Sequence, residues 1–207
     1  MDHKDKVAET IASVGISRRT TTKALALGSL AAFAGLAIST PAYAANQAGW
    51  RWCSKCEGMF YRKDTHGPNI VGGTSTGACP AGGGHNDSAS GKYFERVGED
   101  GRLQQGGWRW CRKCEGLFYR RDTHGANLVG GSSTGVCPTG GGHDDSASGH
   151  YAAIIGEDIT GKQQGGWRWC RKCEGMFYAR ASAGKGNCPA DHQPHDDSAS
   201  GHYASLI

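Results

Sequence analysis

One thirteen-residue pattern occurs three times in this chain and restricts the fold more than any other feature. Its copies occupy residues 49–61, 107–119 and 166–178. Each reads Gly-Trp-Arg-Trp-Cys, two variable or basic residues, Cys-Glu-Gly, Met or Leu, and Phe-Tyr. A third cysteine and then a histidine follow every copy, with Asp-Ser-Ala-Ser-Gly shortly after the histidine. The copies are 58 and 59 residues apart, which indicates small modules rather than a thin solenoid.

Each copy carries the signals of β-strands. Trp108 and Trp110 alternate with an arginine, which places both indoles on one face of an extended segment. Phe118 and Tyr119 favour a second strand, and residues 151–155 favour a third. No stretch after residue 45 has a sustained helical period. We therefore predict an all-β fold with extensive loops.

The chain after residue 44 lacks the aliphatic side chains of an ordinary core. Leu, Ile and Val together account for 13 of its residues, whereas Gly accounts for 31. Such a composition is typical of disorder unless another feature stabilises the chain. Six tryptophans and nine cysteines, all regularly placed, indicate a folded chain instead. Small units with weak cores depend on disulfide bonds or on metal ions.

The cysteines and histidines provide one set of four candidate ligands per repeat. A Cys-x-x-Cys pair can supply two corners of a tetrahedron, and the later Cys and His supply the other two. Three thiolates and one imidazole make a closed structural zinc site, so we predict three structural Zn²⁺ ions per chain. His192 competes with His195 in the third repeat. The predicted ligands are Cys53, Cys56, Cys79 and His85; Cys111, Cys114, Cys137 and His143; and Cys170, Cys173, Cys188 and His195.

Two other uses of the cysteines stay open. Disulfide bonds are common in exported proteins, but three cysteines per repeat would leave one thiol unpaired in each repeat. Cys-x-x-Cys is also the arrangement of redox pairs, although no βαβ pattern surrounds it here.

The repeats divide the chain into four parts. We expect a removed signal segment in residues 1–44, followed by repeats over residues 45–105, 106–164 and 165–207. The favoured architecture is three tandem β modules of the zinc-knuckle or zinc-ribbon kind, joined by Gln-Gly linkers. The alternative is a single domain with pseudo-threefold symmetry, similar to a β-trefoil.

Residues 1–44 have the layout of an export signal. A polar segment precedes a weakly apolar run, and Ala42-Tyr43-Ala44 forms a small-x-small cleavage site. The pair Arg18-Arg19 resembles a twin-arginine signal, which exports folded cargo, although Thr21 stands where an apolar residue is usual. General secretion and a retained anchor are the alternatives. We expect a secreted protein with no stable membrane span once the signal is removed.

Common catalytic motifs do not appear. A catalytic zinc keeps an open coordination position, whereas each repeat offers four good ligands. No His-Glu-x-x-His or P-loop sequence occurs, and no His-x-Glu precedes the Cys-x-x-Cys pairs. We therefore expect no catalytic residues and a protein that is not an enzyme, with a zinc-dependent hydrolase as the least favoured alternative.

Surface features suggest what such a protein binds. The tryptophan pairs offer flat faces for sugar rings, and burial in the core is the competing interpretation. The formal net charge is only +4, so no nucleic-acid partner is expected. In residues 144–149 we expect an Asx turn and an oxygen that accepts the ring N–H of His143. The candidate ligand-binding residues are Trp50, Trp52, Trp108, Trp110, Trp167 and Trp169.

The strings Trp-Arg-Trp-Cys-x-Lys-Cys-x-Gly-Met/Leu-Phe-Tyr and Cys-Pro-x-Gly-Gly-x-His resemble a tandem repeat of secreted actinobacterial proteins. The resemblance covers nearly all of residues 49–207, except that residues 190–194 replace the Gly run in the third repeat. It implies export and modularity, and the repeat has no established activity. We expect a secreted, zinc-stabilised protein that binds cell-wall or extracellular polysaccharide through three weak sites. A secreted toxin or inhibitor acting on a protein or membrane target is the alternative, and the sequence does not indicate the oligomeric state.

Overall fold

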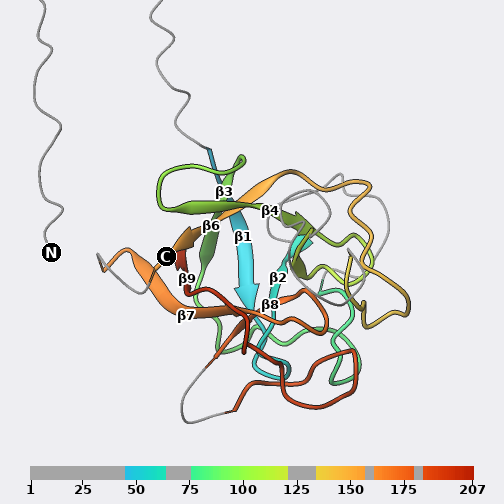
Figure 1. The fold of residues 1–207 in the computed structure, drawn as a ribbon. Helices are drawn as coiled ribbons and strands as arrows, with labels where there is room; N and C mark the ends of the chain where they lie inside the picture. The colour runs from blue at the N-terminus through green and yellow to red at the C-terminus, as the bar shows by residue number, and fades with distance from the viewer. Residues whose placement is uncertain (1–44, 64–75, 121–133, 157–160, 180–183) are drawn as a thin grey trace, which may run out of the picture. The chain divides into compact units, whose positions relative to one another are not determined.

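The fold is described by a computed structural model, in which the elements of the described residues are all β-strands (Figure 1). This confirms the predicted all-β class. The expected signal segment lies outside the described residues, and so do the long loops of the first two repeats. Within the part of the chain that is described, no helix has the length and hydrophobicity to span a bilayer. The described residues are 45–63, 76–120, 134–156, 161–179 and 184–207.

Each repeat contributes three strands in the same order. A seven-residue strand enters the Cys-x-x-Cys turn, a three-residue strand leaves it, and a third strand follows the histidine. The strands are β1 (Asn46–Trp52), β2 (Met59–Tyr61) and β3 (Tyr93–Val97); β4 (Gln104–Trp110), β5 (Leu117–Tyr119) and β6 (Tyr151–Ile155); and β7 (Gln163–Trp169), β8 (Met176–Tyr178) and β9 (Tyr203–Leu206).

The long strand is the centre of a three-stranded antiparallel sheet in each repeat. In the first repeat, Trp50 pairs with Tyr61 on β2 and with Tyr93 on β3. The register between β1 and β3 shifts between Ala48 and Trp50, at Gly49, whose φ is 104°. Glycine adopts this conformation without steric cost, so the strand forms a bulge there.

The Gln-Gly segments between repeats are parts of strands. Gln105 on β4 pairs with Ala153, and Gln164 on β7 pairs with Ser205. The expectation that these segments are linkers is therefore wrong, because their backbone groups are hydrogen-bonded in the sheet.

The last strands of the three repeats pair with one another in a nearly closed antiparallel ring. Each pairing joins the fourth residue of one strand to the second residue of the next, so the register repeats with pseudo-threefold symmetry. This arrangement corresponds to the closed alternative, with three similar modules built on one shared sheet (Figure 1). The pairs are Arg96 with Ala152, Ile154 with Ala204, and Leu206 with Phe94.

Aromatic side chains fill the junctions between repeats. The first tryptophan of each copy is completely buried and packs against a tyrosine of another repeat, with ring centroids 5.2–5.4 Å apart. Such contacts contribute both buried area and favourable ring electrostatics. The core is therefore shared between repeats, which compensates for the scarcity of aliphatic residues. The pairs are Trp50–Tyr151, Trp108–Tyr203 and Trp167–Tyr93.

The tryptophans do not form an exposed stacking platform. All six are buried, with exposed fractions between 0% and 8%. The indoles lie in the core, as the competing interpretation expects. The six residues are Trp50, Trp52, Trp108, Trp110, Trp167 and Trp169.

Candidate metal centres

The Cys-x-x-Cys segments form tight turns, here called knuckles, at the ends of β1, β4 and β7. In the first knuckle, the N–H of Cys53 donates to the carbonyl of Gly58 at 3.0 Å, and the N–H of Glu57 donates to the carbonyl of Cys53 at 2.9 Å. Glu57 has a φ of 62°. This turn brings Cys53 and Cys56 to one buried site.

The structure brings all twelve predicted ligands together in three buried groups. In each group the ligand atoms lie within 4.8 Å of one another. His195 belongs to the third group, whereas the competing His192 is exposed. The groups are Cys53, Cys56, Cys79 and His85; Cys111, Cys114, Cys137 and His143; and Cys170, Cys173, Cys188 and His195.

The distances within the groups fit a four-coordinate ion. The sulfur atoms of the first and third cysteines are 3.8–3.9 Å apart, and the second cysteine's sulfur is 3.4–3.5 Å from the histidine Nδ1. Metal–sulfur bonds of about 2.3 Å and metal–nitrogen bonds of about 2.0 Å require tetrahedral edges of roughly 3.8 Å and 3.5 Å. All nine cysteines are free thiols, so the disulfide alternative is not realised in this structure. The three groups can hold metal ions.

Hydrogen bonds among the sulfurs favour one thiolate in each site, while they and burial raise the pKa of the second cysteine, Cys56, Cys114 or Cys173. The pKa of Cys53 lies far below its ordinary value, because the thiols of Cys56 and Cys79 donate hydrogen bonds to it. Burial lowers the pKa of His85, but its interactions with the sulfurs of Cys53 and Cys79 outweigh burial and raise the pKa to about 9. His143 behaves in the same way. Such sites concentrate negative charge on sulfur, which suits a bound cation.

Backbone groups surround the ligands. The N–H of Asn86 points at the sulfur of Cys53 at 3.3 Å, and Asp144 and Asp196 repeat the contact in the other sites. Nδ1 of each histidine faces the sulfurs, so Nε2 faces away from them. A backbone N–H aimed at a thiolate partly neutralises its charge.

The partner of the histidine ring differs from the one that the sequence predicts. Nε2 of His85 lies 3.2 Å from the carbonyl oxygen of Cys114, and Nε2 of His143 lies 3.2 Å from that of Cys173. The expected carboxylate or hydroxyl of the same repeat is therefore replaced by a backbone carbonyl of another repeat. Nε2 of His195 is buried and has no hydrogen-bond partner among the residues that the structure describes.

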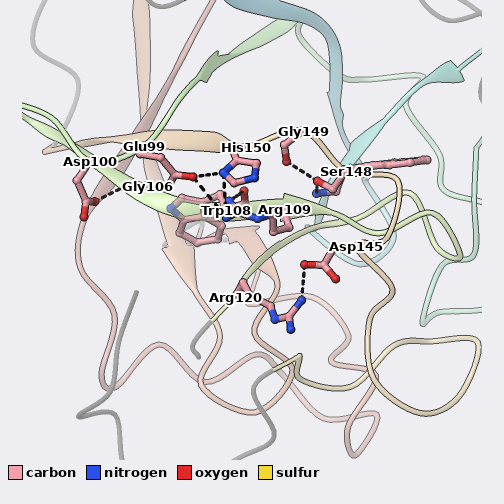
Figure 2. A network of polar contacts seen from close by, with 11 residues as sticks. Glu99, Asp100, Gly106, Trp108, Arg109, Arg120, Asp145, Ser148, Gly149 and His150 are labelled. Atoms are coloured by element: carbon pink, nitrogen blue, oxygen red, sulfur yellow. Dashed lines mark hydrogen bonds and ion pairs between the residues drawn. The ribbon is translucent and has the colours of Figure 1, made fainter. Parts of the chain in front are cut away.

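The Asp-Ser-Ala-Ser-Gly run ties the histidine loop to the long strand. The N–H of Ser146 donates to Asp144 Oδ1 at 3.0 Å, which confirms the predicted Asx turn. Ser148 Oγ accepts the N–H of Trp110 at 2.7 Å. Figure 2 shows Asp145 paired with Arg120, and Glu99 in contact with His150 and Arg109. The Arg120–Asp145 pair has a distance of 2.5 Å. The histidine thus sits on a loop fixed at several points.

One buried glutamate per knuckle was not predicted from the sequence. Glu115 Oε2 accepts the indole N–H of Trp110 at 2.9 Å, and Lys63 of the first repeat lies 2.7 Å from the other carboxyl oxygen. Burial raises the pKa of Glu115, and Lys63 opposes the rise. Glu57 and Glu174 accept from Trp52 and Trp169 in the same way. The signal for these residues was present, since every copy reads Cys-Glu-Gly.

The basic residues of the knuckles bind within their own repeats. Lys55 donates to the carbonyl of Gly82 at 2.5 Å, and Lys113 donates to that of Gly140 at 2.8 Å. Arg112 pairs with Asp144 at 2.7 Å. These contacts support a structural role for the basic residues.

A separate cleft lies between the first and third repeats. It has a volume of about 250 Å³ and contains a hydrogen bond of 2.8 Å from the hydroxyl of Tyr93 to Gln164 Oε1. Tyr178 is half-buried there, whereas the corresponding Tyr61 and Tyr119 are only 3% and 2% exposed. The lining residues are Trp52, Ala89, Gly91, Tyr93, Gln164 and Tyr178.

No protein-family model, curated protein or solved structure matches the chain.

Proposed function

We propose that this protein is a secreted, zinc-stabilised, non-enzymatic protein that binds cell-wall or extracellular polysaccharide. The observation that carries the proposal is the aromatic cleft between the first and third repeats. Export is supported by the signal-like segment in residues 1–44.

Zinc is the proposed ion because of the ligand chemistry. Three thiolates and one imidazole in a tetrahedral arrangement are typical of structural zinc. Four protein ligands at each site leave no coordination position for a reacting water molecule, which supports a structural role. Loading of the metal-free chain with Zn²⁺, Mg²⁺ or Ca²⁺ tests this assignment. We expect three tightly held Zn²⁺ ions per chain by native mass spectrometry and retention of neither oxygen-preferring ion; the reverse preference would contradict it.

The cleft has the chemistry of a sugar subsite. The half-buried ring of Tyr178 is the aromatic surface of the cleft that is partly exposed, and the amide of Gln164 supplies hydrogen-bonding groups beside it. Because Gln164 Oε1 already accepts the hydroxyl of Tyr93, its two N–H groups are the donors left for a ligand. The volume of about 250 Å³ lies just below the range of small-molecule pockets, about 300–1,000 Å³, so the cleft suits a small group rather than a long chain. We therefore propose one principal site at this junction, in contrast to the three weak sites expected from the sequence.

Isothermal titration of the full chain with soluble fragments of cell wall, chitin and cellulose tests the proposal. We expect binding of one of these glycans with a stoichiometry near one and an affinity in the weak range, because a single-ring cleft buries little surface. Gln164→Ala should weaken binding at least tenfold. Its matched control is Gln105→Ala, because Gln105 accepts the hydroxyl of Tyr203 at another junction.

Two outcomes would contradict the proposal in different ways. If the unaltered chain binds none of these glycans, the function is wrong. If it binds and the two glutamine variants weaken binding equally, the site is wrong while polysaccharide binding stands. Thermal melts of both variants show whether either change acts through stability.

A further inference from the structure

We propose that the three metal sites are coupled in a ring, so that the chain takes up and releases its metal ions together rather than site by site. Each site is built from one repeat, but its histidine loop rests on the knuckle of the next repeat. The direction is the same throughout: the first repeat contacts the second, the second contacts the third, and the third contacts the first. This inference does not depend on the proposed polysaccharide binding.

The first coupling contact holds the histidine ring. His85 is a ligand in the first site, and its Nε2 faces the carbonyl of Cys114, which is itself a ligand in the second site. His143 faces the carbonyl of Cys173 in the third site in the same way. A hydrogen bond at Nε2 fixes the ring orientation and tautomer that leave Nδ1 free to bind metal. A knuckle that changes shape therefore moves the imidazole of its neighbour.

The second contact is a close approach of backbones. Gly135 has a φ of 62°, and a Cβ at this position would lie 2.1 Å from the carbonyl oxygen of Cys173. The neighbouring Val136 N–H donates to the same carbonyl at 3.3 Å. Gly77 and Gly186 approach the carbonyls of Cys114 and Cys56 equally closely. Each loop that delivers the third cysteine is therefore fitted against a ligand residue of the next site.

The third contact comes from the short strands. The N–H of Tyr61 donates to the carbonyl of Glu115, and the N–H of Tyr119 donates to that of Glu174, both at 2.9 Å. Tyr178 closes the ring by donating to the carbonyl of Glu57 at 2.9 Å. Each accepting glutamate directly follows the second cysteine of its knuckle. The knuckles of the second and third repeats thus each hold three segments of the preceding repeat, and the knuckle of the first repeat holds two, through Gly186 and Tyr178.

These contacts make the loss of one ion costly for its neighbours. An empty knuckle has no ion to fix its sulfur atoms, so its carbonyl groups no longer hold the preceding histidine loop in place. The neighbouring site then binds metal more weakly, and by linkage a filled site strengthens its neighbour. Chains with one or two ions are accordingly disfavoured relative to empty and fully loaded chains.

Chelator titration of the zinc-loaded full chain, followed by native mass spectrometry, tests the coupling. At half-saturation we expect mostly chains with three ions or none, and fewer than about one fifth with one or two. Independent and equal sites would leave about three quarters of the chains with one or two ions. That distribution would overturn the proposal.

A glycine pair separates coupling from general stability. Gly135→Ala disrupts the contact with Cys173 without removing a ligand, so the variant should accumulate partly loaded chains. Gly141→Ala is the matched control, because Gly141 has a similar φ of 66° but no atom within 4 Å of the added Cβ. Its metal distribution should match that of the unaltered chain. Identical distributions in the two variants would contradict a role for the contact.

A ligand variant gives an answer even if Gly135→Ala does not fold. Cys114→Ser removes one ligand of the second site. With Zn²⁺ in excess, coupled sites predict clearly fewer than two ions per chain, including the case in which the chain unfolds and retains none. A folded variant that holds two ions at unchanged affinity would show that the sites are independent.

Discussion

Glu95 is a buried carboxyl group on β3, one of the three strands that form the sheet ring. It is 2% exposed, and Ser205 Oγ donates to it at 2.7 Å. Burial raises its pKa from 4.5 to about 8, with the hydrogen bond from Ser205 opposing the rise. Ala153 occupies the corresponding position of the second repeat. Glu95 therefore adds to the first repeat a titratable group that the second repeat lacks at this position.

This burial predicts a pH dependence of stability. The folded chain keeps its proton on Glu95 up to about pH 8, whereas the unfolded chain loses it near pH 4.5. Below pH 4.5, Glu95 is protonated in both states, so its burial causes no pH-dependent loss of stability. As pH rises from 4.5 toward 8, the free energy of unfolding falls by at most about 1.4 kcal/mol per pH unit. Glu95→Gln should leave stability nearly unchanged at pH 4.5 and raise the free energy of unfolding by a few kcal/mol at pH 8.

Urea unfolding of zinc-loaded protein at the two pH values measures this difference. Glu99→Gln is the charge-matched control, because the side chain of Glu99 is 43% exposed. It should not reproduce the gain at pH 8. Equal effects of Glu95→Gln at both pH values would show that the carboxyl group is not held protonated.

At the scale of structural elements, Ser148 connects the histidine loop to β4. Its Oγ accepts the backbone N–H of Trp110, which is a buried residue, and donates to the carbonyl of Gly149 (Figure 2). Ser148→Ala leaves the N–H of Trp110 without this acceptor, so we expect a loss of about 1–3 kcal/mol in the free energy of unfolding. Chemical denaturation provides the measurement.

Ser146→Ala serves as the comparison for this change. Ser146 lies two residues earlier in the same loop and is exposed, so its substitution should cost less than about 0.5 kcal/mol. Equal losses in the two variants would mean that the loop as a whole, rather than the acceptor for Trp110, determines stability.

The elements also show what the sequence predicts well. Alternating Trp108 and Trp110 identify a strand, and the spacing of Cys111, Cys114 and Cys137 identifies a ligand set, because side-chain type and local spacing determine both. The Asx turn at Asp144 follows for the same reason.

Contacts between repeats could not be predicted in this way. The acceptor for His143 is the carbonyl of Cys173, and every residue type carries such a carbonyl, so the sequence gives no sign of it. Residues 151–155 read as a strand, yet nothing in their side chains specifies β3 and β9 as partners. The six tryptophans are buried instead of forming exposed faces for sugar rings. The sequence could not decide between the two, because an aromatic side chain needed for sugar binding and one needed for a core look identical in sequence.

At the scale of the whole molecule, the ring of strands makes each repeat dependent on the others. β9 pairs with both β6 and β3, and Tyr203 packs against Trp108. A chain that ends after residue 161 loses these partners and one of the three metal sites. We expect no cooperative thermal transition from this truncated chain in near-ultraviolet circular dichroism. A transition at the midpoint of the full chain would show that the repeats fold separately.

The central claim is that three four-ligand metal sites hold this sheet together. The most direct test is native mass spectrometry of the folded chain before and after chelation, with a count of reactive thiols and a circular dichroism spectrum at each stage. We predict three ions per chain and nine protected cysteines before chelation. After chelation, nine reactive thiols should appear together with loss of the β-sheet signal. A chain that contains no metal, keeps its sheet and lacks free thiols would contradict the account.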